Sequence, residues 1–403
     1  MATFQDIEGG GITTPLGFQA GAAACGIKRP GADKLDLMVL FTPHETTAAA
    51  TFTSNRVKAA PVRVCQEHMQ GNDIRAVIVN SGNANACTGA QGLTDAREMA
   101  TLTANKFGLK SEQVFVCSTG VIGTPMPMER LRAGFETAAQ LGDDPLPPTM
   151  AIMTSDTVAK YRAVDVTLGN GQAVKIGAMT KGAGMICPNM ATMLCFITTD
   201  AAIHLDCLRE LTKRAVKYTF NRITVEGDMS TNDTVLVIAN GQAKNTPIES
   251  DTSEAAAFYE ALYDIMLSLA KAMIRDAEKA TRFIELTVRG ASTEEDAHTI
   301  GKAVANSVLV KCMWNAGQPY WGRVMHAIGY AGVEVDETRI SIDFNDVPAA
   351  REGIAAGTPV STMRDETDSK EHRLVIDLGL GEASATVYTT DLNENFVEFN
   401  LLD

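Results

Sequence analysis

The segment Lys181–Ala201 reads KGAGMICPNMATMLCFITTDA and changes character half-way along. Its first half, Lys181–Ala191, carries the glycines, proline and asparagine that favour loops. Its second half, Thr192–Thr199, is apolar and rich in β-branched residues, which is typical of a buried strand. A flexible loop is therefore expected to feed directly into a rigid strand, with the small residue Ala191 before a threonine hydroxyl at Thr192.

This junction has a chemical use. A threonine hydroxyl is a weak nucleophile unless a base lies beside it. If the bond between Ala191 and Thr192 is cut, the freed α-amino group, whose pKa is ordinarily about 8, is such a base. A Gly-rich loop can promote the cut by an N-to-O acyl shift. Most Ala-Thr junctions before a strand are only structural, so the interpretation depends on the rest of the chain.

The segments on either side predict a mixed α/β protein. A hairpin is predicted around Gly169-Asn170-Gly171 and a helix within Ser253–Ala280, where apolar residues recur at helical spacing. Short apolar or alternating runs predict further strands at Asp36–Phe41, Arg75–Asn80, Val114–Cys117, Thr234–Ala239, Phe283–Val288, Arg339–Phe344, Arg373–Leu378 and Ala383–Tyr388. Strands and helices do not alternate strictly, so layered sheets covered by helices fit better than a doubly wound parallel sheet.

Composition limits the function classes. A formal net charge of -14 argues against nucleic acid or an anionic membrane as a partner. The start MATFQDIEGGG is acidic where a secretory signal is basic, and no apolar run reaches the roughly 18 residues of a membrane span. Eight cysteines are scattered without a CxxC pair, which is typical of thiols in a reducing compartment. We expect a cytoplasmic protein.

Several segments together resemble the ornithine acetyltransferase family. The match of Lys181–Ala201 to that family's self-processing segment is long and specific. It is accompanied, in the family's order, by SNRVKAAPV (Ser54–Val62), NSGNANACTG (Asn80–Gly89), STGVIG (Ser118–Gly123), IMTSDT (Ile152–Thr157), TFNRITVEGDMSTNDTVLVIANG (Thr219–Gly241), DAEKATRFIEL (Asp276–Leu286) and DLNENFVEFN (Asp391–Asn400). The chain is identified as a member of this family along nearly its whole length.

The resemblance implies a fold and a set of roles. The fold is a layered αββα-type sandwich of the ornithine acetyltransferase and aminopeptidase kind, with a smaller C-terminal lobe at about 285–403. Cleavage would give one chain of residues 1–191 and another of 192–403, with Thr192 as nucleophile. Thr119 and Gly120 match the oxyanion-hole pair, which suits donors at the end of a strand. The residues that match substrate-binding positions are Ser155, Lys181, Thr192, Glu278 and Asn400.

The implied reaction is acetyl transfer from N-acetyl-L-ornithine to L-glutamate in arginine biosynthesis, through an acetyl-Thr192 intermediate. Because donor and acceptor share the α-amino acid portion, one site can serve both halves of a ping-pong scheme. Some relatives also use acetyl-CoA, and the sequence leaves this donor open. No other cofactor is expected. The implied partners are small amino-acid substrates and the two cleaved chains, as a dimer of such pairs.

The segment GDMSTNDT brings Asp228, Asn232 and Asp233 close together in the sequence, as a metal-binding loop does. The spacing does not match a calcium loop, and the histidines form no HExxH pair. We therefore expect a turn network and no metal.

Two alternatives to the acetyltransferase stay open. One is a self-cleaving amidase or aminopeptidase that passes its acyl group to water. The other is an uncleaved, non-catalytic binding protein, against which the intact Thr192, Thr119 and Gly120 argue.

Some positions depart from the family pattern near the expected substrate pocket. Gln318 and Tyr320 stand where Asp and Asn are usual, Lys279 replaces a glycine beside Glu278, and Met229 replaces a threonine. The chain also ends three residues after Asn400, where many relatives continue to a terminal Thr or Ser. These departures spare the residues of the acyl-transfer chemistry and leave the donor substrate less determined than the nucleophile.

Overall fold

The computed structural model describes residues 4–187 and 193–401. The chain forms two compact units. Unit 1 consists of Met1–Gly182, Asn189–Asn221 and Met229–Ala270, and unit 2 of Ala183–Pro188, Arg222–Asp228 and Lys271–Asp403. The predicted smaller lobe at about 285–403 falls within unit 2, whereas Ala191 and Thr192, the predicted cleavage site, lie outside the described residues.

The first sheet of unit 1 has six strands in the order β1-β7-β8-β9-β10-β4. Their bounds are β1 Phe4–Asp6, β4 Thr47–Phe52, β7 Lys160–Thr167, β8 Ala173–Lys181, β9 Leu194–Thr199 and β10 Thr234–Ala239. Strands β9 and β10 are parallel, and the other neighbours are antiparallel. The hairpin predicted around Gly169-Asn170-Gly171 is confirmed, because Thr167 of β7 pairs with Ala173 of β8.

The second sheet of unit 1 has four strands in the order β2-β3-β5-β6. They are β2 Gln19–Ala23, β3 Leu37–Phe41, β5 Ala76–Asn83 and β6 Val114–Val121. Met38 and Ile78 of this sheet belong to one hydrophobic cluster with Phe196 and Leu236 of the first sheet. The two sheets therefore share a core from which water is excluded, and burial of this apolar surface is the main stabilising contribution.

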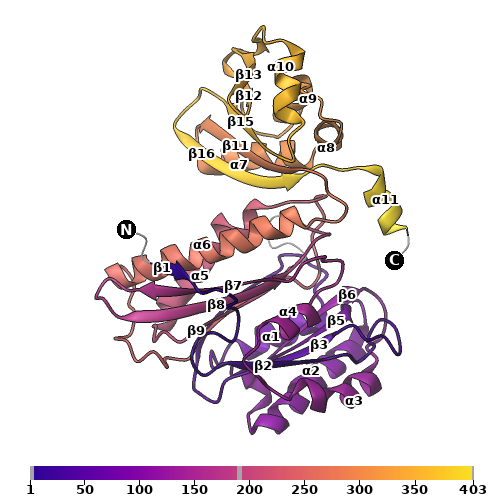
Figure 1. Cartoon of the computed structure of the whole chain (residues 1–403), viewed down its shortest axis with the longest axis vertical. Helices are drawn as coiled ribbons and strands as arrows, with labels where there is room; N and C mark the ends of the chain where they lie inside the picture. The colour runs from indigo at the N-terminus through magenta and orange to yellow at the C-terminus, as the bar shows by residue number, and fades with distance from the viewer. Residues whose placement is uncertain (1–3, 188–192, 402–403) are drawn as a thin grey trace. The chain divides into compact units, whose positions relative to one another are not determined.

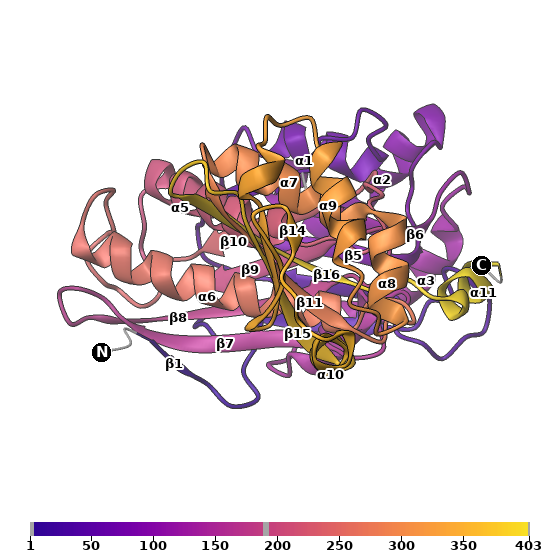
Figure 2. The ribbon, with the colours of Figure 1, turned by 90° about the horizontal axis from the view of Figure 1, so that it is seen from above.

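Helices accompany both sheets. Helices α1 (Ala60–His68) and α2 (Gly89–Phe107) contact β6, whereas α3 (Met128–Ala138) contacts β2 and β3, and α4 (Leu146–Ala151) contacts strands of both sheets. Helix α5 (Leu205–Tyr218) contacts β4, and α6 (Ser253–Arg275) runs alongside β7 and β8 in both views (Figure 1, Figure 2). This arrangement confirms the predicted layered αββα sandwich of a mixed α/β protein.

Unit 2 is built on one six-stranded sheet in the order β14-β13-β12-β15-β11-β16. Its strands are β11 Phe283–Ala291, β12 Ser341–Phe344, β13 Val347–Arg351, β14 Ile354–Ala355, β15 Glu371–Asp377 and β16 Ala383–Thr390. Its helices are α7 Glu294–Asn306, α8 Val308–Asn315, α9 Trp321–Gly329, α10 Val360–Thr367 and α11 Glu394–Asn400. Buried Trp314 and Phe344 belong to its separate core.

The strand expected at Val114–Cys117 is longer than predicted. It continues to Val121 as β6, and Thr119 and Gly120 pair in parallel register with Ser81 and Gly82 of β5. The predicted end at Cys117 was wrong because β5 supplies a partner for these residues. Among the described residues, no helix is both long and apolar enough to cross a membrane.

Candidate functional site

Lys181, the last residue of β8, lies inside unit 1 and is only 2% exposed. Its Nζ donates hydrogen bonds to Thr154 Oγ1 at 2.7 Å and to Thr119 Oγ1 at 3.3 Å. A buried ammonium is unfavourable unless polar groups surround it. The structure thus brings two predicted site residues, Lys181 and Thr119, together with a hydroxyl that the sequence did not single out.

The backbone at Gly120 has a φ of +135°, a conformation that favours glycine. A Cβ at this position would lie 2.3 Å from the carbonyl carbon of Gly82 and 2.5 Å from the nitrogen of Asn83. Ser118 Oγ also donates to Asn80 Oδ1 at 2.6 Å, which ties β6 to β5 at the same level. The Thr119–Gly120 backbone is therefore held in a conformation that requires glycine at the second position.

Asp156 supplies the negative charge beside the lysine. One carboxylate oxygen accepts from Lys160 Nζ at 2.8 Å and from the Gly182 nitrogen at 2.7 Å, and the other accepts from the Thr154 nitrogen at 3.1 Å. Burial by itself raises the pKa of Asp156, but the charges of Lys181 and Lys160 outweigh it and bring that pKa down to about 2. Asp156 is therefore ionised at neutral pH, and it lowers the cost of burying Lys181.

The segment IMTSDT contributes differently from what the sequence predicted. The hydroxyl that contacts Lys181 belongs to Thr154, whereas Ser155 is half-buried and its substrate-binding role stays a prediction. Thr154 also receives a hydrogen bond at its carbonyl oxygen from Lys34 Nζ at 2.9 Å. Thr154 and Asp156 were missed as individual residues. The sequence signal that could identify them is the succession Thr154-Ser155-Asp156, in which two hydroxyl groups are followed by a carboxylate.

The segment GDMSTNDT forms a turn network, as expected. Asn232 Nδ2 donates to the carbonyl oxygens of Ala84 at 2.6 Å and Ser118 at 2.8 Å. Asp233 is fully buried, and its Oδ1 accepts from the Met193 nitrogen at 3.0 Å. In the described parts of the chain, no three His, Cys, Asp or Glu residues cluster as a metal site would require.

The predicted substrate residues of unit 2 lie on a turn and a short helix. The Glu278 nitrogen donates to the Ala183 carbonyl oxygen at 2.9 Å, and Asn400 Nδ2 donates to Glu278 Oε2 at 3.3 Å. A Cβ at Gly184 would lie 2.4 Å from the Glu278 carboxyl carbon, so this glycine permits the close approach. Glu278 and Asn400 are thus brought together within unit 2, and their substrate-binding role stays a prediction.

The whole chain was compared with known proteins. The model of the ArgJ family matches residues 19–401. The arginine biosynthesis bifunctional protein ArgJ of Geobacter sulfurreducens is 46% identical over 95% of this chain and 98% of its own length. The protein of the same name from Symbiobacterium thermophilum is 44% identical over 97% and 98%.

The chain belongs to the ArgJ family. It is an acetyltransferase of arginine biosynthesis, which confirms the enzyme class that the sequence predicts. Among solved structures, the ornithine acetyltransferase of Mycobacterium tuberculosis complexed with ornithine is 36% identical, over 46% of this chain and 98% of that chain, with a TM-score of 0.41.

The departures from the ArgJ family pattern have distinct structural settings. Lys279 has a φ of +56°, so the usual glycine suits this backbone, and its carbonyl oxygen accepts from Asn393 Nδ2 at 2.7 Å. Tyr320 is 61% exposed, with the Arg323 guanidinium 5.7 Å from its ring centroid. Met229 accepts from Ser54 Oγ at its sulfur and from Asn55 Nδ2 at its carbonyl oxygen. Nothing in the structure explains Gln318.

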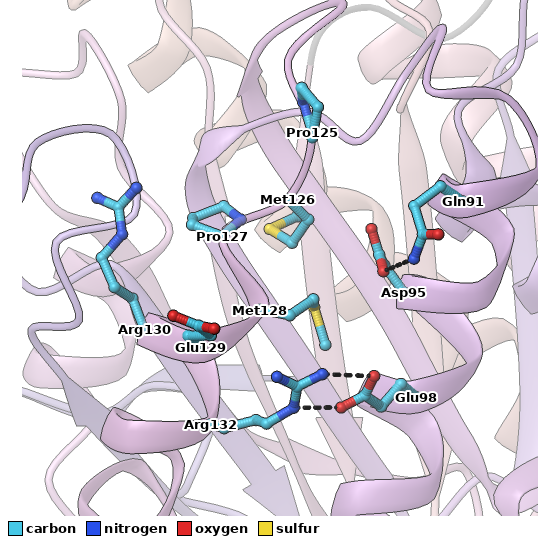
Figure 3. Close-up of a pocket in the computed structure, with 10 residues that line it drawn as sticks. All are labelled: Gln91, Asp95, Glu98, Pro125, Met126, Pro127, Met128, Glu129, Arg130 and Arg132. Carbon is cyan, nitrogen blue, oxygen red and sulfur yellow. Dashed lines mark hydrogen bonds and ion pairs between the residues drawn. The ribbon is translucent and has the colours of Figure 1, made fainter.

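A hollow of about 450 Å³ lies elsewhere in unit 1, between α2 and the start of α3 (Figure 3). Met126 and Met128 line it, Arg132 forms an ion pair with Glu98, and Gln91 donates to Asp95 at 2.8 Å. None of the described site residues lines this hollow.

Proposed function

We propose that this ArgJ-family enzyme cuts itself between Ala191 and Thr192 and then moves an acetyl group from N-acetyl-L-ornithine to L-glutamate through acetyl-Thr192. The observation that carries the proposal is the buried contact of Lys181 Nζ with Thr119 Oγ1 and Thr154 Oγ1. It places a fixed positive charge and a hydroxyl donor together. Lys181 also pairs with Leu194 in the β8–β9 register, two residues after Thr192.

Self-cleavage starts with attack of the Thr192 hydroxyl on the Ala191 carbonyl carbon. The acyl group passes from nitrogen to oxygen, and water then hydrolyses the ester, which leaves a carboxylate on Ala191 and a free amine on Thr192. Strain in the preceding loop favours this route, since Met185 adopts a left-handed φ of +56°. The Ile186 carbonyl oxygen is held by the Val225 nitrogen at 2.8 Å, so the loop has a fixed anchor.

The transfer itself has two halves. Thr192 Oγ1 attacks the acetyl carbonyl of the donor while the Thr192 amine takes the hydroxyl proton. Thr119 and Gly120 stabilise the oxyanion, the carbon–nitrogen bond breaks, and the proton passes to the leaving amine of ornithine. The amine of glutamate then attacks the ester, and the Thr192 oxygen recovers its proton. Lys181 pairs with the substrate's α-carboxylate, while Ser155, Glu278 and Asn400 bind other polar groups of the amino acid.

We further propose the setting in which this reaction occurs. The fragments Met1–Ala191 and Thr192–Asp403 stay associated because all of β9, in the second fragment, pairs with Ile176–Lys181 of β8, in the first. Such pairs assemble into a dimer in the cytoplasm and use no metal or organic cofactor. Acetyl-CoA is an alternative donor for the first half-reaction.

The test is the intact mass of the denatured protein after brief exposure to N-acetylornithine without glutamate. Two fragments that meet at Ala191–Thr192, with an acetyl group on the second, are expected. Addition of glutamate should then remove the adduct and yield N-acetylglutamate. Thr192→Ala should give one uncut, unmodified chain. Loss of the adduct to free acetate without glutamate indicates the hydrolase instead, and an uncut wild-type chain contradicts the proposal. Replacing N-acetylornithine with acetyl-CoA tests the second donor.

A further inference from the structure

Asp233 is a buried acid that the proposed reaction does not yet use. It stands directly before β10, is fully buried, and its backbone carbonyl oxygen accepts from the Thr53 nitrogen at 2.9 Å. Its Oδ1 accepts from the Met193 nitrogen at 3.0 Å, and the next residue, Thr234, donates its nitrogen to the Met193 carbonyl oxygen at 3.2 Å. The Asp233–Thr234 pair thus holds Met193 through both polar groups of its backbone.

The other carboxyl oxygen of Asp233 is different. Oδ2 is buried and has no hydrogen-bond partner among the described residues. Burial is costly for a carboxylate, and it raises the pKa of Asp233 well above its usual value, although the Met193 nitrogen and the Thr53 and Ser230 side chains act to lower that pKa. Among described charged groups, Lys181 opposes this rise, but Nζ of that residue donates to Thr119 and Thr154. Within the part of the chain that the structure describes, no ion pair to the Asp233 carboxyl group is formed.

The neighbouring residue, Asn232, fixes the position of Asp233 relative to β6, the strand that carries the predicted oxyanion donors. Asn232 Nδ2 donates to the Ser118 carbonyl oxygen, directly before Thr119, and to the Ala84 carbonyl oxygen beyond the paired end of β5. One short segment therefore links the predicted oxyanion donors to Met193. Met193 is bonded to Thr192, so the Thr192 amine is separated from the Met193 nitrogen only by its own Cα and carbonyl carbon.

We propose that Asp233 is a positioning residue for Thr192, in which one oxygen fixes the Met193 amide and the other pairs with the α-amino group that cleavage releases. This inference rests on the proposed function, because only cleavage creates that amine. Cleavage supplies the cation that the buried carboxyl group lacks. When the amine takes the proton of the Thr192 hydroxyl, the Asp233 carboxylate stabilises the ammonium that forms. No atom of Asp233 bonds to the substrate.

The proposal gives the Thr192 amine an unusual titration. The Lys181 charge, which acts on the Asp233 carboxyl, acts to lower the pKa of an amine beside that carboxyl. A carboxylate partner acts in the opposite direction, and an opposite charge at close range typically shifts a pKa by about 1–3 units. Whether the pKa of the Thr192 amine lies above or below that of an ordinary amino terminus therefore shows whether a carboxylate pairs with it.

The experiment measures that pKa in the native, cleaved wild-type enzyme. Brief reductive methylation across pH 6–10, read by mass spectrometry, reports the reactivity of the Thr192 amine, with the amino terminus of the first fragment as internal reference. A midpoint at least about one pH unit above the reference is expected. A midpoint equal to or below the reference overturns the proposal. If the wild-type chain is uncut, the proposed function fails instead, so the two failures are distinguishable.

Asp233→Asn and its matched control sharpen the result. The isosteric amide keeps an acceptor for the Met193 nitrogen and removes the charge, so the Thr192 midpoint should fall to or below the reference, and acetyl-Thr192 formation should slow at least about tenfold. The rising limb of the pH–rate profile should move to lower pH. An unchanged midpoint and profile in cleaved Asp233→Asn overturn the proposal. If this variant stays uncut, the wild-type midpoint alone decides.

Asp200→Asn is the control. Asp200 is a buried acid at the opposite end of β9, and its two oxygens accept from the Lys175 nitrogen at 2.7 Å and the Leu16 nitrogen at 3.2 Å. The same chemical change there should leave the Thr192 midpoint where it is. A shift as large as that of Asp233→Asn would show a general effect on the sheet and overturn the assignment.

Discussion

The predicted site residues of unit 1 and unit 2 differ in how firmly the fold holds them. Lys181 and Thr119 are buried at the ends of two strands and joined by a hydrogen bond. Glu278 is half-buried on a turn, and Asn400 is exposed on a seven-residue helix that reaches Glu278 through one 3.3 Å hydrogen bond. A transition-state donor must be held rigidly, because its placement decides how well it stabilises developing charge. The fold therefore holds the predicted site residues Lys181 and Thr119 of unit 1 more firmly than Glu278 and Asn400 of unit 2.

The buried lysines of the two units show that burial alone does not mark a site. Lys311 of unit 2 is 1% exposed, and its Nζ donates to Thr389 Oγ1 at 2.9 Å and the Thr390 carbonyl oxygen at 2.8 Å. Burial lowers the pKa of Lys311 to about 7. Lys181 instead has ionised Asp156 near it, which favours the charged form that binds a carboxylate.

The largest effect is expected from Thr119→Val, which removes one proposed oxyanion donor while keeping the branched shape. The kcat for acetyl transfer should fall about 100- to 1000-fold, because a lost oxyanion-hole donor typically costs that much. Steady-state kinetics with N-acetylornithine and glutamate provide the measurement, with Thr119→Ser as the variant that retains the hydroxyl. If Thr119→Val keeps the wild-type kcat, the Thr119 hydroxyl does not stabilise the oxyanion.

Lys181→Met should have the next largest effect. Hydrogen bonds to a charged group are worth about 1.5–3 kcal/mol, so kcat/KM should fall about 10- to 150-fold. Lys311→Met is the matched control, since it removes an equally buried ammonium from unit 2 and should leave kcat/KM close to wild type. Equal losses in both variants would contradict the distinction between the two lysines.

The sequence predicted the strands whose signal is local. The apolar, β-branched residues of β3, β5 and β10 and the Gly-Asn-Gly turn predict these elements from their own local sequence. It did not predict that β6 continues through Gly120, because that depends on pairing with β5, which is distant in the chain.

The site was predictable to the extent that the family resemblance named its residues. The resemblance pointed to Thr119 and Lys181, which the structure joins. It did not separate Thr154 from Ser155, since neighbouring hydroxyls point in different directions and only the fold decides which one meets Lys181. Asp233 was read as part of a turn, and its bond to Met193 spans 40 residues of sequence.

A smaller effect is expected in the pH dependence of stability, where Glu226 of unit 2 and Asp156 of unit 1 contribute with opposite signs. Burial, reinforced by Asp228 and Glu278, raises the pKa of Glu226 to about 8, so its contribution is full below its usual pKa of 4.5 and is lost as the pH rises towards 8. Asp156, with a pKa of about 2, contributes above 3.8 and loses this contribution only as the pH falls through 2. Between pH 5 and 7, Glu226→Gln should therefore flatten the fall in the free energy of unfolding by up to about 1.4 kcal/mol per pH unit.

Urea unfolding of wild type and Glu226→Gln at pH 5, 6 and 7 measures this difference. Lys311, with a pKa of about 7, has its own effect above this window. Identical slopes in the two proteins would mean that the Glu226 carboxyl is ionised in the folded state and that the polar interior of unit 2 resembles that of unit 1.

The smallest effect concerns the turn that carries Glu278. Lys279 adopts a left-handed φ of +56°, which costs an L-residue about 1–2 kcal/mol, and its Nζ lies 4.9 Å from the centroid of the Phe399 ring, an attraction of about 0.5–1 kcal/mol. Lys279→Gly and Lys279→Ala both lose that attraction, but only glycine relieves the strain. Lys279→Gly should therefore be more stable than Lys279→Ala by about 1 kcal/mol in urea unfolding, after allowance for the greater freedom of glycine in the unfolded chain. The KM values of the two variants should agree, because the Glu278 backbone is held by Ala183 in both. If alanine is as stable as glycine, the turn relaxes out of the left-handed conformation at no cost, and Glu278 is even less firmly held within unit 2 than its contacts there indicate.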